Sequence, residues 1–353
     1  MLASVTRVLP ADDEGSVRDA ADRLRAGELV ALPTETVYGL AARAYDEDAV
    51  LSVFAAKGRP GFDPLIVHVT RASRAELEEQ GVLDGSRLSE AAARAVDALA
   101  ALWPGPLTLV LPKGPSVPDA ATSGLDTVAV RAPSHPTTRA VIDALGEPLV
   151  MPSANRFGRV SPTEAAHVAD ELGEAVALVL DAGATEHGVE STIVGIEDDG
   201  TARLLRPGAL PRETIEEALG APLGEPAHAG ADGGEAPLAP GMLASHYAPR
   251  KTLRLLDAAE VDLAKDAPPP EGRPGVILYS NARRIALEAR WAPAHTRVLS
   301  PEGDDREAAR KLFAALRELD ASDADWILAE LPPEGDGLRP AIRDRLRRAA
   351  AAR

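Results

Sequence analysis

One break in the sequence divides the chain. From Ala221 to Ala239 it reads "APLGEPAHAGADGGEAPLA", which is rich in Gly, Ala and Pro and has no period. Such a composition is typical of a linker, because it favours neither a helix nor a strand. The length of 353 residues also exceeds the ~150 residues that are usual for one domain. We therefore predict a domain over 1–220, a linker over 221–250 and a second domain over 251–353.

Both predicted domains alternate strand-like and helix-like segments. In the first, residues 29–33, 64–69 and 126–133 are apolar runs separated by stretches of helical periodicity, and the small residues 39–44 are expected to start a helix. This order predicts an α/β fold, an open twisted mixed sheet with helices. After Arg250 the order β-α-β-α-β-α predicts a smaller doubly wound, Rossmann-like domain.

Composition excludes several classes of site. The chain has no cysteine, so disulfides, thiolate zinc sites and cysteine nucleophiles are excluded. Its net charge of −17 argues against a broad non-specific grip on nucleic acid, although it permits a local basic pocket. No apolar run reaches the ~20 residues of a membrane span, and none resembles a leader. We expect a cytoplasmic protein without membrane contact.

The common catalytic fingerprints are missing. The sequence has no G-x-x-x-x-G-K-[ST], G-x-G-x-x-G, H-E-x-x-H or G-x-S-x-G motif, and its seven histidines include no pair at metal-ligand spacing. What remains is a set of polar clusters at strand ends of the first domain. Ligands of open α/β sheets bind beside strand ends, so these clusters are the candidates for a site.

Three of the clusters carry cations. Lys57 and Arg59 straddle Gly58 at an expected exposed helix end, where they either complement the helix dipole or form a fork suited to a polyphosphate. Arg131 interrupts an apolar strand and so needs an internal carboxylate or a ligand that bears one. Arg206 ends another strand. These residues predict a site for anionic substrates.

The other clusters carry hydroxyls or a histidine. Residues 34–38 are compatible with a turn held by hydroxyl–backbone bonds, and His68 is more typical of a core residue than of a ligand. Residues 161–164 fit a capping box with Ser161 as N-cap, which leaves Ser153 unexplained, and the polar residues 190–192 precede a strand. Together the clusters predict a site that holds charged substrates in line, with no obvious general base.

Several motifs, in this order and spacing, resemble one family. "LPTETVYGL", "KGRP", "PLIVHV", "VAVRAP", "PSAN", "SPT", "STIV" and "LRPGA" closely resemble the threonylcarbamoyl-AMP synthase family. "PGMLASHYAP" and "LRPAIRDRLRRAA" resemble the linker motif and the closing motif of its two-domain form, so the resemblance covers nearly the whole chain.

The resemblance implies a nucleotidyltransferase. Such an enzyme joins L-threonine, bicarbonate (or CO₂) and ATP into L-threonylcarbamoyl-AMP and releases pyrophosphate. Partner proteins of a transfer complex then pass the threonylcarbamoyl group to the adenosine beside the anticodon of tRNA. Magnesium is implied as a companion of ATP, without a dedicated metal site in the protein.

The resemblance also implies individual roles. Lys57 and Arg59 would be catalytic through their contact with the triphosphate. Threonine would lie against Thr36, His68, Arg131, Met151 and Ser191. ATP would lie against Lys57, Arg59, Asp63, Thr127, Ser153, Ser161, Arg206 and His246, with Tyr247 as part of a lid.

Two positions have a physical reading of their own. The family commonly has asparagine where this chain has Asp63. A carboxylate beside phosphates is repulsive unless magnesium lies between them, so metal ligation is an alternative role for Asp63. His246 and Tyr247 end the linker and are expected to fold over the nucleotide and exclude water. The second domain is expected to hold this lid and to carry no second active site.

Three other functions fit parts of the sequence. An RNA-binding module could use the cations on phosphates, but the net charge and an aromatic content of 3% disfavour it. A carbamoyltransferase that uses carbamoyl phosphate would carry extra zinc or acylphosphatase modules, and the absence of cysteine argues against these. A non-catalytic regulator would have a degenerate pocket, whereas every cluster is intact.

Overall fold

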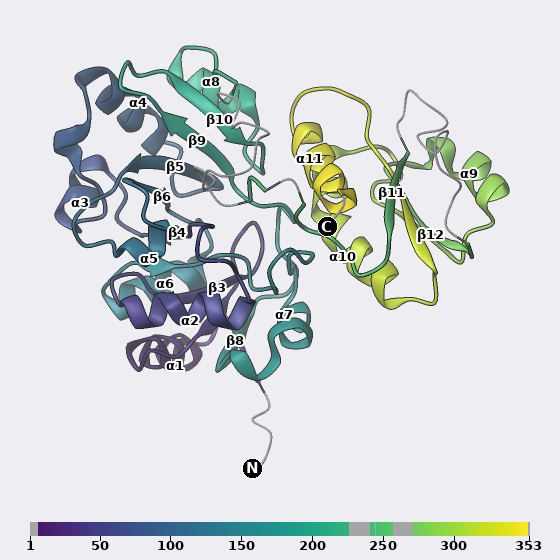
Figure 1. The fold of residues 1–353 in the computed structure, drawn as a ribbon, viewed down its shortest axis with the longest axis horizontal. Coiled ribbons are helices and arrows are strands. Elements are labelled where there is room, and N and C mark those ends of the chain that lie inside the picture. The colour runs from purple at the N-terminus through teal and green to yellow at the C-terminus, as the bar shows by residue number, and fades with distance from the viewer. Residues whose placement is uncertain (1–5, 226–240, 244, 257–270, 352–353) are drawn as a thin grey trace.

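The protein consists of two α/β units (Figure 1). The computed structural model describes residues 6–225, 241–243, 245–256 and 271–351. The N-terminal unit is on the left of Figure 1 and the C-terminal unit on the right. Part of the predicted linker, residues 226–240 and 244, lies outside the described residues.

The N-terminal unit is built on a ten-stranded sheet in the order β1-β8-β2-β3-β7-β4-β6-β5-β9-β10. The sheet is mixed, because β4 pairs with β6 in parallel whereas β5 pairs with β6 antiparallel. This confirms the predicted open mixed sheet. Its strands are β1 (Arg7–Pro10), β2 (Val30–Leu32), β3 (Gly39–Arg43), β4 (Ile66–His68), β5 (Leu107–Pro112), β6 (Thr127–Arg131), β7 (Leu149–Val150), β8 (Leu178–Asp181), β9 (Thr192–Ile196) and β10 (Ala202–Arg206).

The helices of this unit leave part of one sheet face to other segments. They are α1 (Glu14–Arg25), α2 (Glu47–Lys57), α3 (Arg74–Glu79), α4 (Glu90–Ala100), α5 (Asp119–Thr122), α6 (Pro136–Leu145), α7 (Ala165–Leu172) and α8 (Arg212–Leu219). Side chains of a strand alternate between faces. Val67 and Val150 therefore join the main core with α2 and α4, whereas Leu149 faces α1 and α6. On that second face, Ile66 and Ala129 belong to a separate small hydrophobic cluster, against which Leu205 and Met242 pack.

The C-terminal unit has a parallel sheet in the order β11-β14-β12-β13. Its elements are β11 (Leu253–Leu256), β12 (Pro274–Leu278), α9 (Arg284–Trp291), β13 (His295–Val298), α10 (Asp305–Ala321), β14 (Trp326–Glu330) and α11 (Arg339–Ala350). Leu287 of α9 packs with Val276 on one face, and α10 and α11 pack with Ile277 on the other. Helices on both faces confirm the doubly wound prediction. Among the described residues, no helix has the length and apolar content needed to span a membrane.

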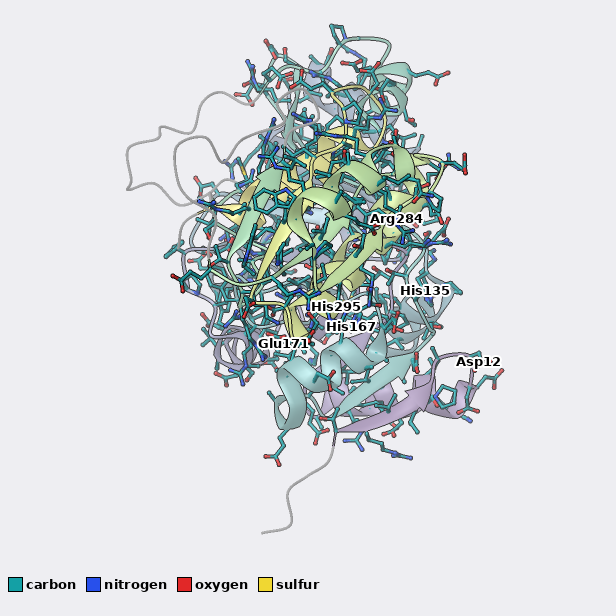
Figure 2. The ribbon with its side chains drawn as sticks, turned by 90° about the vertical axis from the view of Figure 1, so that its right-hand side faces the viewer. Asp12, His135, His167, Glu171, Arg284 and His295 are labelled. Carbon is teal, nitrogen blue, oxygen red and sulfur yellow. The ribbon has the colours of Figure 1, made fainter. Side chains whose placement is uncertain are left out.

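The two units share a hydrophobic cluster. Val160 and Val189 of the N-terminal unit pack in one cluster with Phe313 of α10. The contact also includes an ion pair, in which Arg317 Nη1 of α10 lies 3.4 Å from Glu171 Oε2 of α7. Figure 2 shows α7, with Glu171 labelled, directly below the C-terminal unit. The contact therefore combines apolar packing with a charged pair.

Two local predictions were wrong. Residues 39–43 form strand β3 and do not start a helix, because they pair with β2 on one side and with β7 on the other. Residue Ser161 does not cap a helix, since α7 begins only at Ala165. The Ser161 hydroxyl instead donates a hydrogen bond to Glu190 Oε1 at 2.6 Å. In both cases tertiary pairing overrides a local preference.

Gly188 of the N-terminal unit lies directly against the backbone of α10, which allows a matched test. Its φ is +71°, and an added Cβ would lie 2.4 Å from the Arg310 Cα of α10. Gly183 has a similar φ of +75° with nothing within 4 Å of the added Cβ. We expect Gly183→Ala to cost about 1 kcal/mol of backbone strain, and Gly188→Ala to cost about 2 kcal/mol more through overpacking. Thermal unfolding measures the difference, and equal Tm shifts in the two variants would contradict the tight contact.

Candidate active site

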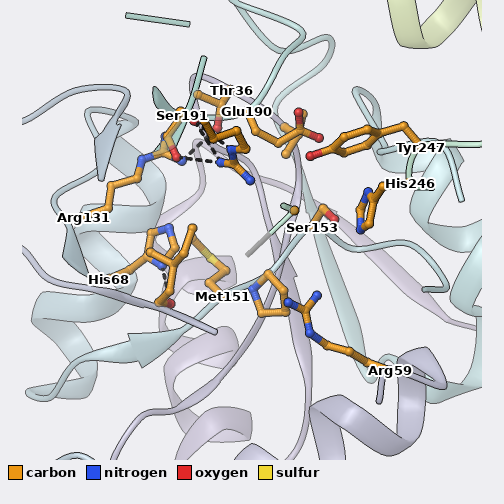
Figure 3. Close-up of a pocket in the computed structure, with 15 residues that line it drawn as sticks. Thr36, Arg59, His68, Arg131, Met151, Ser153, Glu190, Ser191, His246 and Tyr247 are labelled. Atoms are coloured by element: carbon orange, nitrogen blue, oxygen red, sulfur yellow. Dashed lines mark hydrogen bonds between the residues drawn. The ribbon is translucent and has the colours of Figure 1, made fainter. Parts of the chain in front are cut away.

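The candidate site lies on the part of the sheet face that the N-terminal helices do not cover. A pocket there is bounded by strand ends of the N-terminal unit and by residues 241 and 246–247. Its lining includes most of the predicted site residues: Thr36, Arg59, His68, Arg131, Met151, Ser153, Ser191, Arg206, His246 and Tyr247. Figure 3 shows Arg131 and His68 on one side of this pocket and Arg59 and His246 on the other.

Arg131 is held by two neighbours from the turn after β2. Its Nη2 lies 2.6 Å from Glu35 Oε1, and its Nη1 donates to Thr36 Oγ1 at 3.0 Å. The internal carboxylate that the sequence required is thus Glu35. Burial is the largest influence on the Glu35 carboxyl and favours a raised pKa, but the charge and hydrogen bonding of Arg131 together with backbone N–H groups outweigh it and lower that pKa. Arg131 Nε is buried and has no hydrogen-bond acceptor among the described residues.

The turn itself follows the local alternative predicted from its hydroxyls. Thr34 Oγ1 accepts hydrogen bonds from the Thr36 and Val37 backbone N–H groups at 3.1 and 3.2 Å. The Thr36 hydroxyl lies 2.8 Å from Thr34 Oγ1 and also accepts the hydrogen bond from Arg131 (Figure 3). The turn therefore has a structural role and also presents one side chain to the pocket.

His68 is the neighbour of Arg131 in the β4–β6 register. Its Nδ1 lies 3.0 Å from the Ile66 carbonyl oxygen, which can only accept. Nδ1 therefore carries the hydrogen, and Nε2 is an acceptor. Burial, followed by the Arg131 charge, lowers the pKa of His68 to about 3. The ring is neutral near pH 7.

Met151 closes the floor of the pocket against Gly39. A Cβ on Gly39 would lie 2.3 Å from Met151 Cγ, so only glycine fits this position of β3. The backbone N–H of Met151 donates to the Ile66 carbonyl at 3.0 Å, which ties the end of β7 to β4. The close approach of the Met151 side chain thus explains the glycine at position 39.

Ser191 and Arg206 form one wall of the pocket. Arg206 Nη2 donates to the Ser191 carbonyl at 2.9 Å and to Ser191 Oγ at 3.2 Å. The Ser191 hydroxyl also lies 2.8 Å from Thr108 Oγ1. A register shift between Leu204 and Arg206 interrupts the β9–β10 pairing, and such bulges redirect side chains. The bulge explains how a strand-end arginine reaches the pocket.

The predicted exposed fork of Lys57 and Arg59 was wrong. Their exposed fractions are only 2% and 8%. Lys57 Nζ donates to the backbone carbonyls of Ser153 and Asn155 and is not among the residues that line the pocket, whereas Arg59 lines it. Burial lowers the pKa of Lys57 well below its ordinary value. Lys57 thus fixes the loop that carries Ser153, and Arg59 alone of the two reaches the pocket.

Asp63 has an internal partner. It is fully buried, and its Oδ2 lies 2.9 Å from Arg59 Nη2 in an ion pair whose angles fall outside hydrogen-bond geometry. Arg59 is also held by its Nε, which donates to the Asp63 carbonyl at 2.9 Å. Magnesium was suggested above as the positive charge beside the Asp63 carboxylate, and in this structure Arg59 supplies that charge.

The remaining predicted residues lie outside the lining. Thr127 is at the opposite end of β6 from Arg131, a separation of about 13 Å for four strand steps. Ser161 is hydrogen-bonded to Glu190, which lines the pocket. Because Thr127 and Arg131 lie at opposite ends of β6, they do not contact the same atoms of a small ligand.

His246 and Tyr247 close the pocket from the linker side. The His246 ring packs edge-on against Phe157, and Tyr247 stacks on Phe313 of α10 at a centroid distance of 5.6 Å. The remaining cavity measures about 50 Å³, whereas sites for drug-sized ligands measure about 300–1,000 Å³. The cavity in this structure is therefore too small for a ligand as large as a nucleotide.

The side chains present do not form a dedicated metal site. No group of three or more His, Asp or Glu side chains in the described ranges could hold a metal ion. The carboxylate that lines the pocket, Glu190, is already bonded to Ser161 and to Arg345.

Comparison with known proteins places the chain in a family. The sequence profile of a family described as Telomere recombination matches residues 22–208, and that of a Threonylcarbamoyl-AMP synthase, C-terminal domain, matches residues 210–351. The threonylcarbamoyl-AMP synthase of Pyrococcus abyssi is 39% identical over 97% of this chain and 96% of its own. The Bacillus subtilis protein of that name is 37% identical over 99% and 96%. The chain belongs to the threonylcarbamoyl-AMP synthase family, in its two-domain form.

Solved structures of a threonylcarbamoyl-AMP synthase family member agree along the same length. Pyrococcus abyssi Sua5 complexed with L-threonine has a TM-score of 0.77 and 38% identity, over 98% of this chain and 97% of that one. A variant of that protein with an adjacent histidine and tyrosine replaced by alanine has a TM-score of 0.81 and 37% identity, over 98% and 96%. Both units of this chain therefore have counterparts in the family.

Sequence reasoning gave no role to three residues that the structure places at the site. Glu35 pairs with Arg131, Glu190 lines the pocket, and Arg345 reaches Glu190 from α11. Glu35 stands inside LPTETVYGL, Arg345 stands inside LRPAIRDRLRRAA, and Glu190 directly precedes STIV. A buried arginine requires a carboxylate or several other acceptors nearby. That requirement was the available signal for Glu35, whereas nothing in the sequence connects residue 345 with residue 190.

The state of His68 can be measured directly. Because burial and Arg131 lower its pKa to about 3, we expect a neutral ring with hydrogen on Nδ1 at every pH from 8 down to 5. Nitrogen-15 NMR of histidine-labelled protein shows this, with the signal assigned by His68→Asn. A His68 signal that titrates near the ordinary value of about 6.5 would contradict the closed, dry environment.

Proposed function

We propose that this protein synthesises L-threonylcarbamoyl-AMP from L-threonine, bicarbonate or CO₂, and ATP, with release of pyrophosphate. One observation carries the proposal. In a member of this family, Arg131, with a free buried donor, and the cations Arg59 and Arg206 line the same pocket. Such a pocket suits an amino-acid carboxylate beside a nucleotide's phosphates. The relatives' names support this function and neither the RNA-binding nor the carbamoyltransferase alternative.

At the amino-acid end, Arg131 would bind the threonine carboxylate. Its Nε is the open donor, while Glu35 and Thr36 hold the guanidinium in place. The neutral His68 offers Nε2 as an acceptor for an N–H or O–H of threonine. Met151 and Ser191 complete this end. The Pyrococcus abyssi protein complexed with L-threonine supports an amino-acid site in this fold.

At the nucleotide end, Arg59 and Arg206 would bind the triphosphate. Both guanidiniums are buried, and charge interactions are stronger in a dry site than in water. Lys57 would act through the loop that carries Ser153. Magnesium would enter with ATP. Ser161 and Thr127 keep their proposed contacts to more distant parts of the nucleotide.

The reaction needs positioning more than proton transfer. The neutral amine of threonine adds to the carbon of CO₂ with release of a proton, or to the carbon of bicarbonate with loss of water, and gives a carbamate. A carbamate oxygen then attacks the α-phosphorus of ATP. The bond between the α-phosphorus and the oxygen that bridges it to the β-phosphorus breaks, and pyrophosphate leaves with the electron pair of that bond. Negative charge grows on pyrophosphate in the transition state, where Arg59 and Arg206 would stabilise it.

The linker residues would protect the product. His246 and Tyr247 would withdraw to admit ATP and return to exclude water from the mixed anhydride. The small cavity that they leave in this structure supports such movement. We further propose that partner proteins of a transfer complex pass the threonylcarbamoyl group to tRNA, since the net charge of −17 favours no direct grip on RNA.

The direct test is pyrophosphate release. We expect purified protein to release pyrophosphate only when ATP, bicarbonate and L-threonine are all present, and to form a product with the mass of threonylcarbamoyl-AMP. L-Serine or L-valine in place of threonine controls for specificity. Pyrophosphate release that is independent of the amino acid would overturn the proposed function.

Arg131 is best tested together with its partner. Arg131→Ala alone leaves Glu35 buried without a counter-charge, which costs about 3–5 kcal/mol. The double change Glu35→Gln with Arg131→Gln removes both charges, so that no buried carboxylate is left without a counter-charge. We expect it to raise the threonine KM at least about tenfold and to change the ATP KM by less than about twofold. Circular dichroism checks folding, and an unchanged threonine KM would show that Arg131 is only an internal ion pair.

A further inference from the structure

Arg345 of the C-terminal unit is completely buried at the junction of the two units. Its exposed fraction is 0% although it is on α11, far along the chain from every predicted site residue. Its Nε donates to Glu190 Oε2 at 2.6 Å, and its Nη1 donates to Asp344 Oδ2 at 2.6 Å. The guanidinium carbon also lies 5.0 Å from the centre of the Tyr247 ring. One side chain thus contacts the pocket wall and the lid.

Both oxygens of Glu190 are engaged by groups from different parts of the fold. Oε1 accepts the Ser161 hydroxyl at 2.6 Å, and Oε2 accepts Arg345. Ser161 gives its hydrogen to Glu190, so its oxygen lone pairs remain as acceptors for a nucleotide N–H or O–H. The order of contacts is therefore Arg345 to Glu190 to Ser161.

A second arginine of the C-terminal unit holds the same segment. Arg317 Nε donates to the Ser161 carbonyl at 3.3 Å, and Arg317 Nη2 donates to the Val160 carbonyl. Burial opposes the charge of Arg345, but Tyr247, Glu190 and Asp344 raise its pKa above the ordinary value. Arg345 is therefore a fixed cation in this contact.

We propose that Arg345 is a positioning residue for the nucleotide, supplied to the active site by the C-terminal domain. It neutralises Glu190 and holds that carboxylate so that Ser161 keeps its acceptor orientation. The inference rests on the proposed function, because it takes ATP as the ligand beside Ser161. It gives the second domain a part in substrate binding beyond holding the lid.

The proposal predicts a selective defect. Without Arg345, Glu190 becomes a buried carboxylate in the pocket that must admit phosphates, and like charges at short range in a poorly solvated site repel strongly. ATP binding should weaken, whereas the threonine end, held by Glu35 and Arg131, should not change. Removing the Glu190 charge as well should restore much of the ATP affinity.

The experiment compares four full-length variants with the parent chain: Arg345→Met, Arg345→Lys, Arg345→Met with Glu190→Gln, and Arg347→Met. Arg347 is exposed on the same helix and serves as the matched control. Isothermal titration calorimetry measures binding of a non-hydrolysable ATP analogue, and steady-state kinetics gives the KM values of ATP and threonine.

We expect Arg345→Met to raise the Kd of the analogue and the ATP KM at least about tenfold, with the threonine KM within about twofold of the parent. Arg345→Lys should be intermediate, since lysine keeps the charge but not the planar fork. The double variant should recover at least half of the lost affinity on a logarithmic scale. Because it leaves no unpaired buried carboxylate, it can still be measured if Arg345→Met does not fold.

Equal effects on both substrates, a lower Tm with unchanged analogue affinity, or no rescue by Glu190→Gln would each overturn the proposal. A parent chain that neither binds the analogue nor releases pyrophosphate would overturn the proposed function instead. The two failures are therefore distinguishable.

Discussion

Buried arginines are the constraint on which this structure depends. A guanidinium removed from water costs several kcal/mol unless a carboxylate or several acceptors face it. The protein meets this requirement separately for each: Arg131 with Glu35, Arg59 with Asp63, and Arg345 with Glu190. Arg206 is held by the Ser191 carbonyl. The pairings keep the cations charged inside the protein and fix their directions, and both properties are needed to bind anionic substrates.

The same requirement joins the two units. Glu190 precedes strand β9 of the N-terminal unit, whereas its counter-charge comes from helix α11 of the C-terminal unit. Around this pair, Tyr247 stacks on Phe313 and the valines of the N-terminal unit complete the apolar cluster of α10. The pocket is thus assembled from both units and the end of the linker. The second domain thus has a physical role in this protein, because its Arg345 neutralises the buried Glu190 of the first domain.

The position of the pocket follows from how the sheet is covered. α1 and α6 cover one half of a face, and the strands beyond them present Ile66, Ala129 and Arg131 on the same side. The alternation of the strands was evident in the sequence, so the fold class and the convergence of strand-end residues could be predicted. Strand β3 could not, because its small residues form a strand only through pairing with both neighbours.

The sequence by itself determined the two α/β units, the family and most of the residues around the pocket, because periodicity and motif spacing are local properties. The tertiary structure decided which of these residues point into the pocket and which support it. Lys57 turns to backbone carbonyls, Asp63 to Arg59, and Ser161 to Glu190 rather than to a helix end. It also decided the role of Arg345, since a contact between residues 155 positions apart depends on the packing of two separate sheets. Charge pairing inside a protein is set by three-dimensional proximity, and a linear pattern records the need for a partner without naming it.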